Sequence, residues 1–215
     1  TSAVQVNSNR FADVDNLGHH LKNTTYNRRH IQKVLALPLV DTEAIRKANF
    51  TVAVDAVNSV GGVVIPQLLR SLGVSNVIEL NCDPTGNFAH NPEPIPENLE
   101  QISQLVKDSG ADVGFVVDPD VDRLAIVMEN GEMFVEEYTL VSIADYVLAN
   151  TPGPAVSNLS SSRALSDVAA RHRCPYVASA VGEVNVTTLM KHIRAVIGGE
   201  GNGGVIYPEL HYGRD

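Results

Sequence analysis

The segment 118–123, with the sequence DPDVDR, holds the residues of this chain that are best suited to chemistry. Its three carboxylates, Asp118, Asp120 and Asp122, stand at alternate positions directly after the apolar run 113–117. Carboxylates this close repel one another unless a cation joins them. An all-oxygen ligand set selects Mg²⁺, Mn²⁺ or Ca²⁺ over zinc or copper. The spacing therefore indicates a metal site, although a solvated acidic turn would also explain three spaced aspartates.

Arg123 ends this segment and suggests what a metal there would do. A guanidinium beside a metal-bound carboxylate cluster suits a phosphoryl group, which can bridge the cation and the arginine fork. Metal plus arginine is a common way to offset charge in phosphoryl transfer. The alternative is an Arg123 that only neutralises its acidic neighbours. An EF-hand loop beginning at Asp118 is disfavoured, because Arg123 stands where that loop requires glycine.

A second candidate is the glycine-rich segment 198–204, GGEGNGG, which follows the apolar residues 195–197. Glycines let the backbone approach a ligand closely. Glu200 and Asn202 place a carboxylate near an amide, and such a pair can bind vicinal sugar hydroxyls. The segment lacks the Gly-Lys-Ser/Thr ending of a Walker A loop, and a strand rather than a helix is expected after it, unlike in a dinucleotide-binding fingerprint. Taken alone, it is equally compatible with a flexible turn.

Alternating strand and helix patterns position both segments. Apolar, β-branched runs indicate strands, and capped or amphipathic runs indicate helices. The expected strands are 50–55, 77–80, 113–117, 124–128, 155–159, 175–179, 195–197 and 205–207. The expected helices are 17–37, 41–45, 63–72, 96–109, 137–149, 162–172 and 183–192, with turns at 58–62 and 130–131. This alternation predicts an α/β fold with mixed, mostly parallel sheets, divided into two domains at the hairpin near residue 130.

Composition narrows the class of ligand. The chain has a net charge of −9, whereas a nucleic-acid-binding protein is more often basic. We expect a small-molecule or cation ligand, with no nucleic acid and no membrane, since no run of about 18 apolar residues occurs. The two cysteines, Cys82 and Cys174, show no metal-binding or disulfide spacing, which favours reduced thiols and a cytoplasmic location.

The segments 118–123 and 199–204 together resemble two loops of the α-D-phosphohexomutase family, which includes phosphoglucomutase, phosphomannomutase and phosphoglucosamine mutase. The first is similar to the metal loop of that family, usually Asp-Gly-Asp-Gly-Asp-Arg, with Pro119 and Val121 in place of the glycines. The ligand positions are intact, so the resemblance implies Mg²⁺ as the cofactor, bound by Asp118, Asp120 and Asp122.

The second segment is similar to the sugar-recognition loop of the family, often Gly-Glu-x-Ser-Gly-His. Asn202 takes the place of the serine and Gly204 that of the histidine, which leaves the individual hydroxyl contacts open. The resemblance implies that Arg123 orients the phosphoryl group. It also implies substrate contacts by Glu200, Asn202 and Gly182. Further similar segments are 54–62, 161–163 and 181–183.

The resemblance implies two consecutive three-layer α/β/α domains, residues 1–132 as domain 2 and 133–215 as an incomplete domain 3. The family interconverts hexose 1-phosphates and 6-phosphates through a phosphoserine on domain 1 and a bisphosphorylated sugar, with a phosphate-binding loop on domain 4. We expect this chain to be a middle fragment without those two domains. By itself it should therefore be inactive, and hexose phosphate and the missing domains should be its partners.

One segment could be mistaken for the catalytic serine loop. Residues 88–92, FAHNP, end like that loop, but Ala89 stands where the serine would be, so a structural loop is expected. Two other functions remain open. One is a non-catalytic α/β binding or regulatory module, and the other is a Mg²⁺-dependent phosphatase with an aspartyl nucleophile. The phosphatase would need a distant lysine and another acidic pair, and the sequence offers no convincing set.

Overall fold

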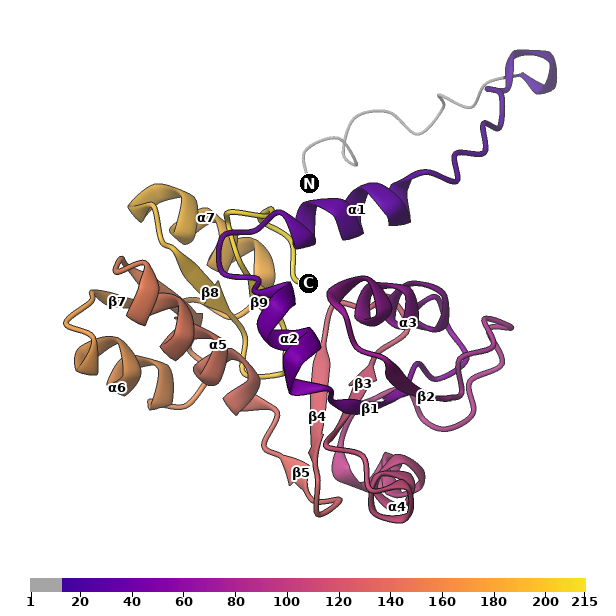
Figure 1. Cartoon of the computed structure of the whole chain (residues 1–215). Helices are drawn as coiled ribbons and strands as arrows, with labels where there is room; N and C mark the ends of the chain where they lie inside the picture. The colour runs from indigo at the N-terminus through magenta and orange to yellow at the C-terminus, as the bar shows by residue number, and fades with distance from the viewer. Residues whose placement is uncertain (1–12) are drawn as a thin grey trace.

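The computed structural model describes residues 13–215 and contains two mixed β-sheets, each covered by helices on both faces (Figure 1). The first sheet has the strand order β2-β1-β3-β4-β5. β1 pairs in parallel with β2 and β3, whereas the β3–β4 and β4–β5 pairs are antiparallel. Its strands are β1 (Thr51–Asp55), β2 (Asn76–Leu80), β3 (Val113–Val117), β4 (Leu124–Met128) and β5 (Met133–Phe134).

Helices α3 and α4 cover opposite faces of this sheet because side chains alternate along β1. Val52 and Val54 pack with Leu69 of α3. Ala53 packs on the other face with Ile102 of α4. The helices of this part of the chain are η2 (Val14–Asn16), α1 (Tyr26–Leu35), α2 (Thr42–Ala48), α3 (Gly61–Leu72), η3 (Pro96–Asn98) and α4 (Glu100–Ser109).

The second sheet has the order β7-β6-β8-β9, with β6 parallel to β7 and β8 and with β9 antiparallel to β8. Helices α5 and α6 share one apolar core with Ala155 and Ile197, and α7 packs on the other face against Val156. Its elements are α5 (Glu137–Asn150), β6 (Ala155–Asn158), α6 (Ala164–Arg171), β7 (Tyr176–Ser179), α7 (Glu183–Ile193), β8 (Ile197–Gly199) and β9 (Val205–Ile206). The expected α/β fold of two three-layer units with mixed sheets is confirmed.

The expected helix over 17–37 is wrong in its first part, because α1 begins at Tyr26. Leu17 is 63% exposed and Leu21 is 88% exposed, so a helix there would bury no apolar face. The side chain of Asn23 instead accepts hydrogen bonds from the backbone N–H and the hydroxyl of Thr25. This local turn competes with helical hydrogen bonding and delays the start of α1.

Two glycine segments expected in turns belong partly to regular elements. Gly61 and Gly62 form the first turn of α3, where a Cβ on Gly62 would lie 2.2 Å from the carbonyl oxygen of Cys82. Gly198 lies in β8, where a Cβ would lie 2.5 Å from the sulfur of Met190. Both corrections have one cause: close packing, rather than chain flexibility, requires glycine at these positions.

The first sheet extends through β5, which pairs with β4 and lies beyond residue 132. The division of the chain at 132/133 remains a prediction of the sequence. Within residues 13–215, no helix is both long enough and apolar enough to cross a membrane.

Candidate functional site

Asp118 is the buried anchor of the acidic loop, directly after β3. Its Oδ1 accepts hydrogen bonds from the backbone N–H groups of Asp122 (3.0 Å) and Arg123 (3.2 Å). Its Oδ2 accepts from Nε of Arg123 at 2.6 Å. Burial raises the pKa of Asp118, but the hydrogen bonds and charge of Arg123 outweigh it, so that the pKa falls below the ordinary value. Asp118 is therefore held in its charged form.

The three aspartates of the acidic loop lie close together. Asp118, Asp120 and Asp122 each offer a carboxylate oxygen, and these oxygens lie within 4.8 Å of one another. Burial raises the pKa of Asp122 to about 6, with Asp118 and Asp120 adding to the shift and Arg214 opposing it. The loop thus carries negative charge that the protein does not fully offset. An all-oxygen set with this excess charge fits a hard divalent cation.

Two further contacts fix the shape of the loop. The hydroxyl of Ser59 donates to the carbonyl of Pro119 at 2.6 Å, and the N–H of Val121 donates to the carbonyl of Asp118 at 3.1 Å. Val121 has φ of 62°, a left-handed conformation that is unfavourable for a β-branched residue. The strained residue thus lies between Asp120 and Asp122, two of the candidate ligands.

Arg123 is held by Asp118 and Glu93, and its Nε also lies 3.6 Å from Oδ1 of Asp122. Besides its bond to Asp118, its Nη1 donates to Oε2 of Glu93 at 2.9 Å. Burial lowers the pKa of the Arg123 guanidinium. Its hydrogen bonds to Asp118 and Glu93 raise the pKa by more than burial lowers it, so that the pKa lies above the ordinary value for arginine. Glu93 follows the FAHNP segment, whose His90 lies 3.1 Å from the fully buried Asp55 at the end of β1. This loop therefore connects Arg123 to the first sheet.

The glycine-rich loop lies directly beside the acidic loop. The N–H of Leu124, the residue after Arg123, donates to the carbonyl of Gly203 at 3.2 Å. Gly203 has φ of 88°, and a Cβ there would lie 2.5 Å from the carbonyl oxygen of Leu124. Only glycine meets both conditions. Two loops that are distant in sequence are thus joined at the junction of the two sheets.

Glu200 is buried and both of its oxygens have protein partners. Oε1 accepts from Nδ2 of Asn158 at 2.6 Å, and Oε2 accepts from Nη1 of Arg214 at 3.0 Å. Asn158 ends β6 and also accepts from the hydroxyls of Ser160 and Ser161. A fixed carboxylate of this kind keeps one orientation, and each oxygen retains a second lone pair for a hydroxyl.

The other two expected substrate contacts lie in different surroundings. The side-chain oxygen of Asn202 accepts from the N–H of Gly204 at 3.2 Å, within its own loop. Gly182 is the N-cap of α7, where its carbonyl accepts from the N–H of Asn185. Its neighbour Glu183, rather than Gly182, is linked to the glycine-rich loop, because both Glu183 and Glu200 are paired with Arg214.

Arg214 joins several carboxylates of the site, and the sequence analysis did not identify it as a site residue. Its Nη2 is paired with Asp122, its Nη1 lies 3.0 Å from Oε2 of Glu200, and its Nε lies 3.3 Å from Oε2 of Glu183. The side chain is only 17% exposed. Arg214 thus links the acidic loop to the glycine-rich loop and to the start of α7. Nothing near it in the sequence indicated these partners, because all three carboxylates come from other segments.

Two models of a known protein family match most of this chain. Residues 28–131 match the model for phosphoglucomutase/phosphomannomutase α/β/α domain II, and residues 136–215 match the model for domain III. The chain belongs to the α-D-phosphohexomutase family. The expected family resemblance is confirmed.

Individual relatives agree with this assignment. A phosphoglucomutase/phosphomannomutase of Thermococcus kodakarensis is 40% identical over 178 residues, which are 82% of this chain and 39% of the relative. A phosphomannomutase/phosphoglucomutase of Pseudomonas putida is 35% identical over 76% of this chain and 36% of its own length. The crystal structure of a family protein from Burkholderia thailandensis superposes with a TM-score of 0.75 at 26% identity, covering 88% of this chain and 40% of that one. This chain thus spans about two fifths of the length of these relatives.

The strained residue of the acidic loop gives a first prediction. At Val121 we expect Val121→Gly to be more stable than Val121→Ala by about 1 kcal/mol in urea unfolding, because a Cβ is unfavourable at positive φ. A matched pair at Gln104, exposed in α4, should show the opposite order, with alanine more stable than glycine by about 1 kcal/mol. The same order at both positions would mean that Val121 is not strained.

The second prediction concerns Arg214. Arg214→Gln should lower the free energy of unfolding by about 1–3 kcal/mol, because Asp122 and Glu200 are left without their common partner. Arg214→Lys should recover only part of this, since an ammonium cannot form the same fork. The control is Arg70→Gln, which removes the more exposed pair with Glu79 and should cost less than about 1 kcal/mol. Equal costs for both glutamine variants would contradict a linking role for Arg214.

Proposed function

We propose that this chain forms the metal-binding and sugar-binding middle of a phosphohexomutase that interconverts hexose 1-phosphates and 6-phosphates. The observation that supports this most is the joining of two distant loops, by the Leu124–Gly203 hydrogen bond and by Arg214. It puts a cation site and a fixed carboxylate acceptor next to each other. A hexose phosphate needs both, because it carries a phosphoryl group and hydroxyls a few bonds apart.

In this proposal Asp118, Asp120 and Asp122 hold Mg²⁺. When bound, the cation would offset negative charge on the oxygens of a phosphoryl group during transfer. Arg123 orients that group, and its bonds to Asp118 and Glu93 limit its movement, so that little side-chain entropy is lost on binding. The phosphoryl donor is a phosphoserine outside the two matched domains.

Glu200 accepts hydrogen bonds from the sugar hydroxyls, and Asn202 in the same loop and Gly182 at the start of α7 make further substrate contacts. The phosphoserine gives its phosphoryl group to one sugar hydroxyl, and the resulting bisphosphorylated sugar returns its other phosphate to the serine. Hydroxyl contacts must therefore serve two orientations of the sugar. A carboxylate suits this, because its two oxygens are equivalent acceptors.

The aspartyl phosphatase is a weaker alternative. Its first aspartate would have to attack a phosphorus atom. Asp118 is fully buried, and each of its oxygens already accepts hydrogen bonds from the loop or from Arg123. These contacts favour a role as a fixed ligand over a role as a nucleophile.

Metal binding tests the first half of the proposal. Calorimetric titration of the chain with MgCl₂ should show weak binding, since the serine phosphate that completes the site is not on these two domains. Asp120→Asn should weaken binding about tenfold or more, because it removes a charged ligand. Asp83→Asn, at an exposed aspartate of another loop, should leave it unchanged. Equal heats for Asp120→Asn and the parent chain would argue against the metal assignment.

Turnover tests the second half. The 215-residue chain alone should not convert glucose, mannose or glucosamine 1-phosphate, because the proposed phosphoryl donor lies outside it. A chimera in which the matching 82% of this chain replaces the aligned 178 residues of the Thermococcus kodakarensis relative should be active on at least one of them. Asp120→Asn in that chimera should lower kcat by about 100-fold or more. Steady conversion by the isolated chain, or a folded chimera without activity, would contradict the proposal.

A further inference from the structure

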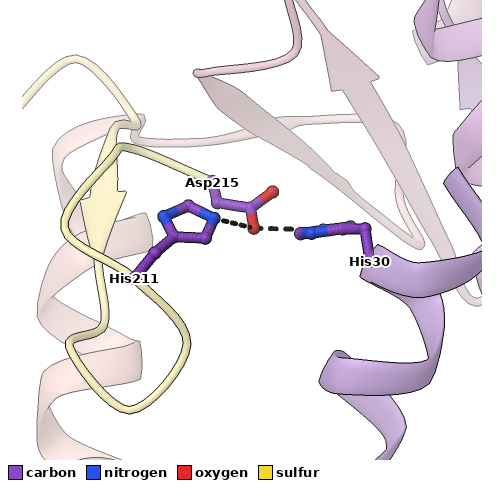
Figure 2. A group of neighbouring side chains, drawn as sticks. All are labelled: His30, His211 and Asp215. Carbon is purple, nitrogen blue, oxygen red and sulfur yellow. Dashed lines mark hydrogen bonds and ion pairs between the residues drawn. The ribbon is translucent and has the colours of Figure 1, made fainter. Parts of the chain in front are cut away.

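Two histidines and a carboxylate lie close together outside the acidic loop and the glycine-rich loop. His30 lies on α1, and His211 and Asp215 lie on the segment after β9; both imidazoles point toward Asp215 (Figure 2). Nε2 of His30 and Nε2 of His211 each lie 3.1 Å from Oδ2 of Asp215. One ligand atom from each residue lies within 4.8 Å of the others. The fold, rather than the sequence, brings them together.

We propose that His30, His211 and Asp215 bind a zinc-class divalent transition-metal ion. Two imidazole nitrogens and one carboxylate oxygen are a ligand set that zinc accepts, with a fourth tetrahedral position left for water. The acidic loop, with oxygen ligands only, suits a hard cation instead. The two sites therefore differ in the metal that they select. The proposal stands on these three residues and is independent of mutase activity.

The two nitrogen–oxygen distances fit such an ion. With metal–ligand bonds of about 2.0–2.1 Å in a tetrahedron, neighbouring ligand atoms are about 3.3 Å apart. The two observed nitrogen–oxygen distances are close to this value. The contact from His211 also has the geometry of a hydrogen bond, whereas the contact from His30 is an approach at ion-pair distance. Metal binding would require the His30 ring to turn its Nε2 lone pair toward the ion and the His211 ring to free its own Nε2.

One hydrogen bond shows what metal binding must change. The N–H of Gly213 donates to Nδ1 of His211 at 3.0 Å, which leaves the ring proton on Nε2. A metal at Nε2 moves that proton to Nδ1, so the bond from Gly213 has to open. Binding at this site therefore includes a local rearrangement of the segment 211–215.

The site is accessible and lies next to the acidic loop. The side chains of His30, His211 and Asp215 are 31%, 42% and 33% exposed, so an ion can reach them from solvent. A cavity of about 260 Å³ is lined by all three and also by Asp120 and Arg214. Asp120 adds favourable charge and Arg214 opposes it. A bound ion would fasten α1 to the segment that carries Arg214, and through it to both loops of the site.

Titration of the full chain with ZnCl₂, in the presence of excess MgCl₂, tests the proposal. We expect one Zn²⁺ per chain, with His30→Ala and His211→Ala each weakening binding about tenfold or more. Co²⁺ used as a probe should give visible tetrahedral absorption bands in the parent chain that both variants lack. Asp120→Asn should retain the Zn²⁺ site, which separates it from the proposed Mg²⁺ site.

The matched control is His172→Ala. His172 also contacts a carboxylate, Asp145, but its partner there is Arg171 rather than a second histidine, so Zn²⁺ binding should not change. Circular dichroism without metal should show that the variants fold, and His30→Gln replaces His30→Ala if it does not. The proposal is overturned if the parent chain binds no Zn²⁺, or if it binds equally well with His30 and His211 replaced. The three residues would then be only a hydrogen-bonded cluster.

Discussion

Negative charge gathered at the junction of the two sheets is the constraint on which the rest of the site depends. Asp118, Asp122 and Glu200 come from two loops and are all wholly or largely buried, so each loses hydration that a carboxylate needs. Arg123 compensates within its own loop, and Arg214 compensates across the two loops. Leaving either arginine out would leave a desolvated carboxylate unpaired, which is far more costly than losing an exposed ion pair.

The backbone adapts to this requirement at specific points. The loops can share Arg214 only if they approach closely, and the contact between Leu124 and Gly203 leaves no room for a side chain on Gly203. The acidic loop turns sharply enough to put Val121 in a left-handed conformation. The hydroxyl of Ser59, on the segment after β1, stabilises the turn by donating a hydrogen bond to the carbonyl of Pro119. Close approach and strain thus occur where the oxygens of the candidate ligands converge.

Compensation by the two arginines is incomplete, and this links the structure to the proposed chemistry. The pKa of Asp122 is raised to about 6 because burial and the charges of Asp118 and Asp120 disfavour its ionised form more than Arg214 favours it. A divalent cation would remove that imbalance. The acidic and the glycine-rich loops lie in the segments that match domains II and III of the α-D-phosphohexomutase family, which agrees with the proposed cation.

The sequence alone determined the α/β fold, the acidic loop and the family, because strand hydrophobicity and carboxylate spacing are local patterns. It could not place the start of α1 at Tyr26 or the helical state of Gly62, since both depend on what a residue packs against. It also missed Arg214 and Asn158. An arginine or an amide acquires its role from its partners, and theirs come from segments that only folding brings near. The sequence thus identified the carboxylates of the two loops and Arg123, whereas the tertiary structure added Arg214 and decided how these charges are paired.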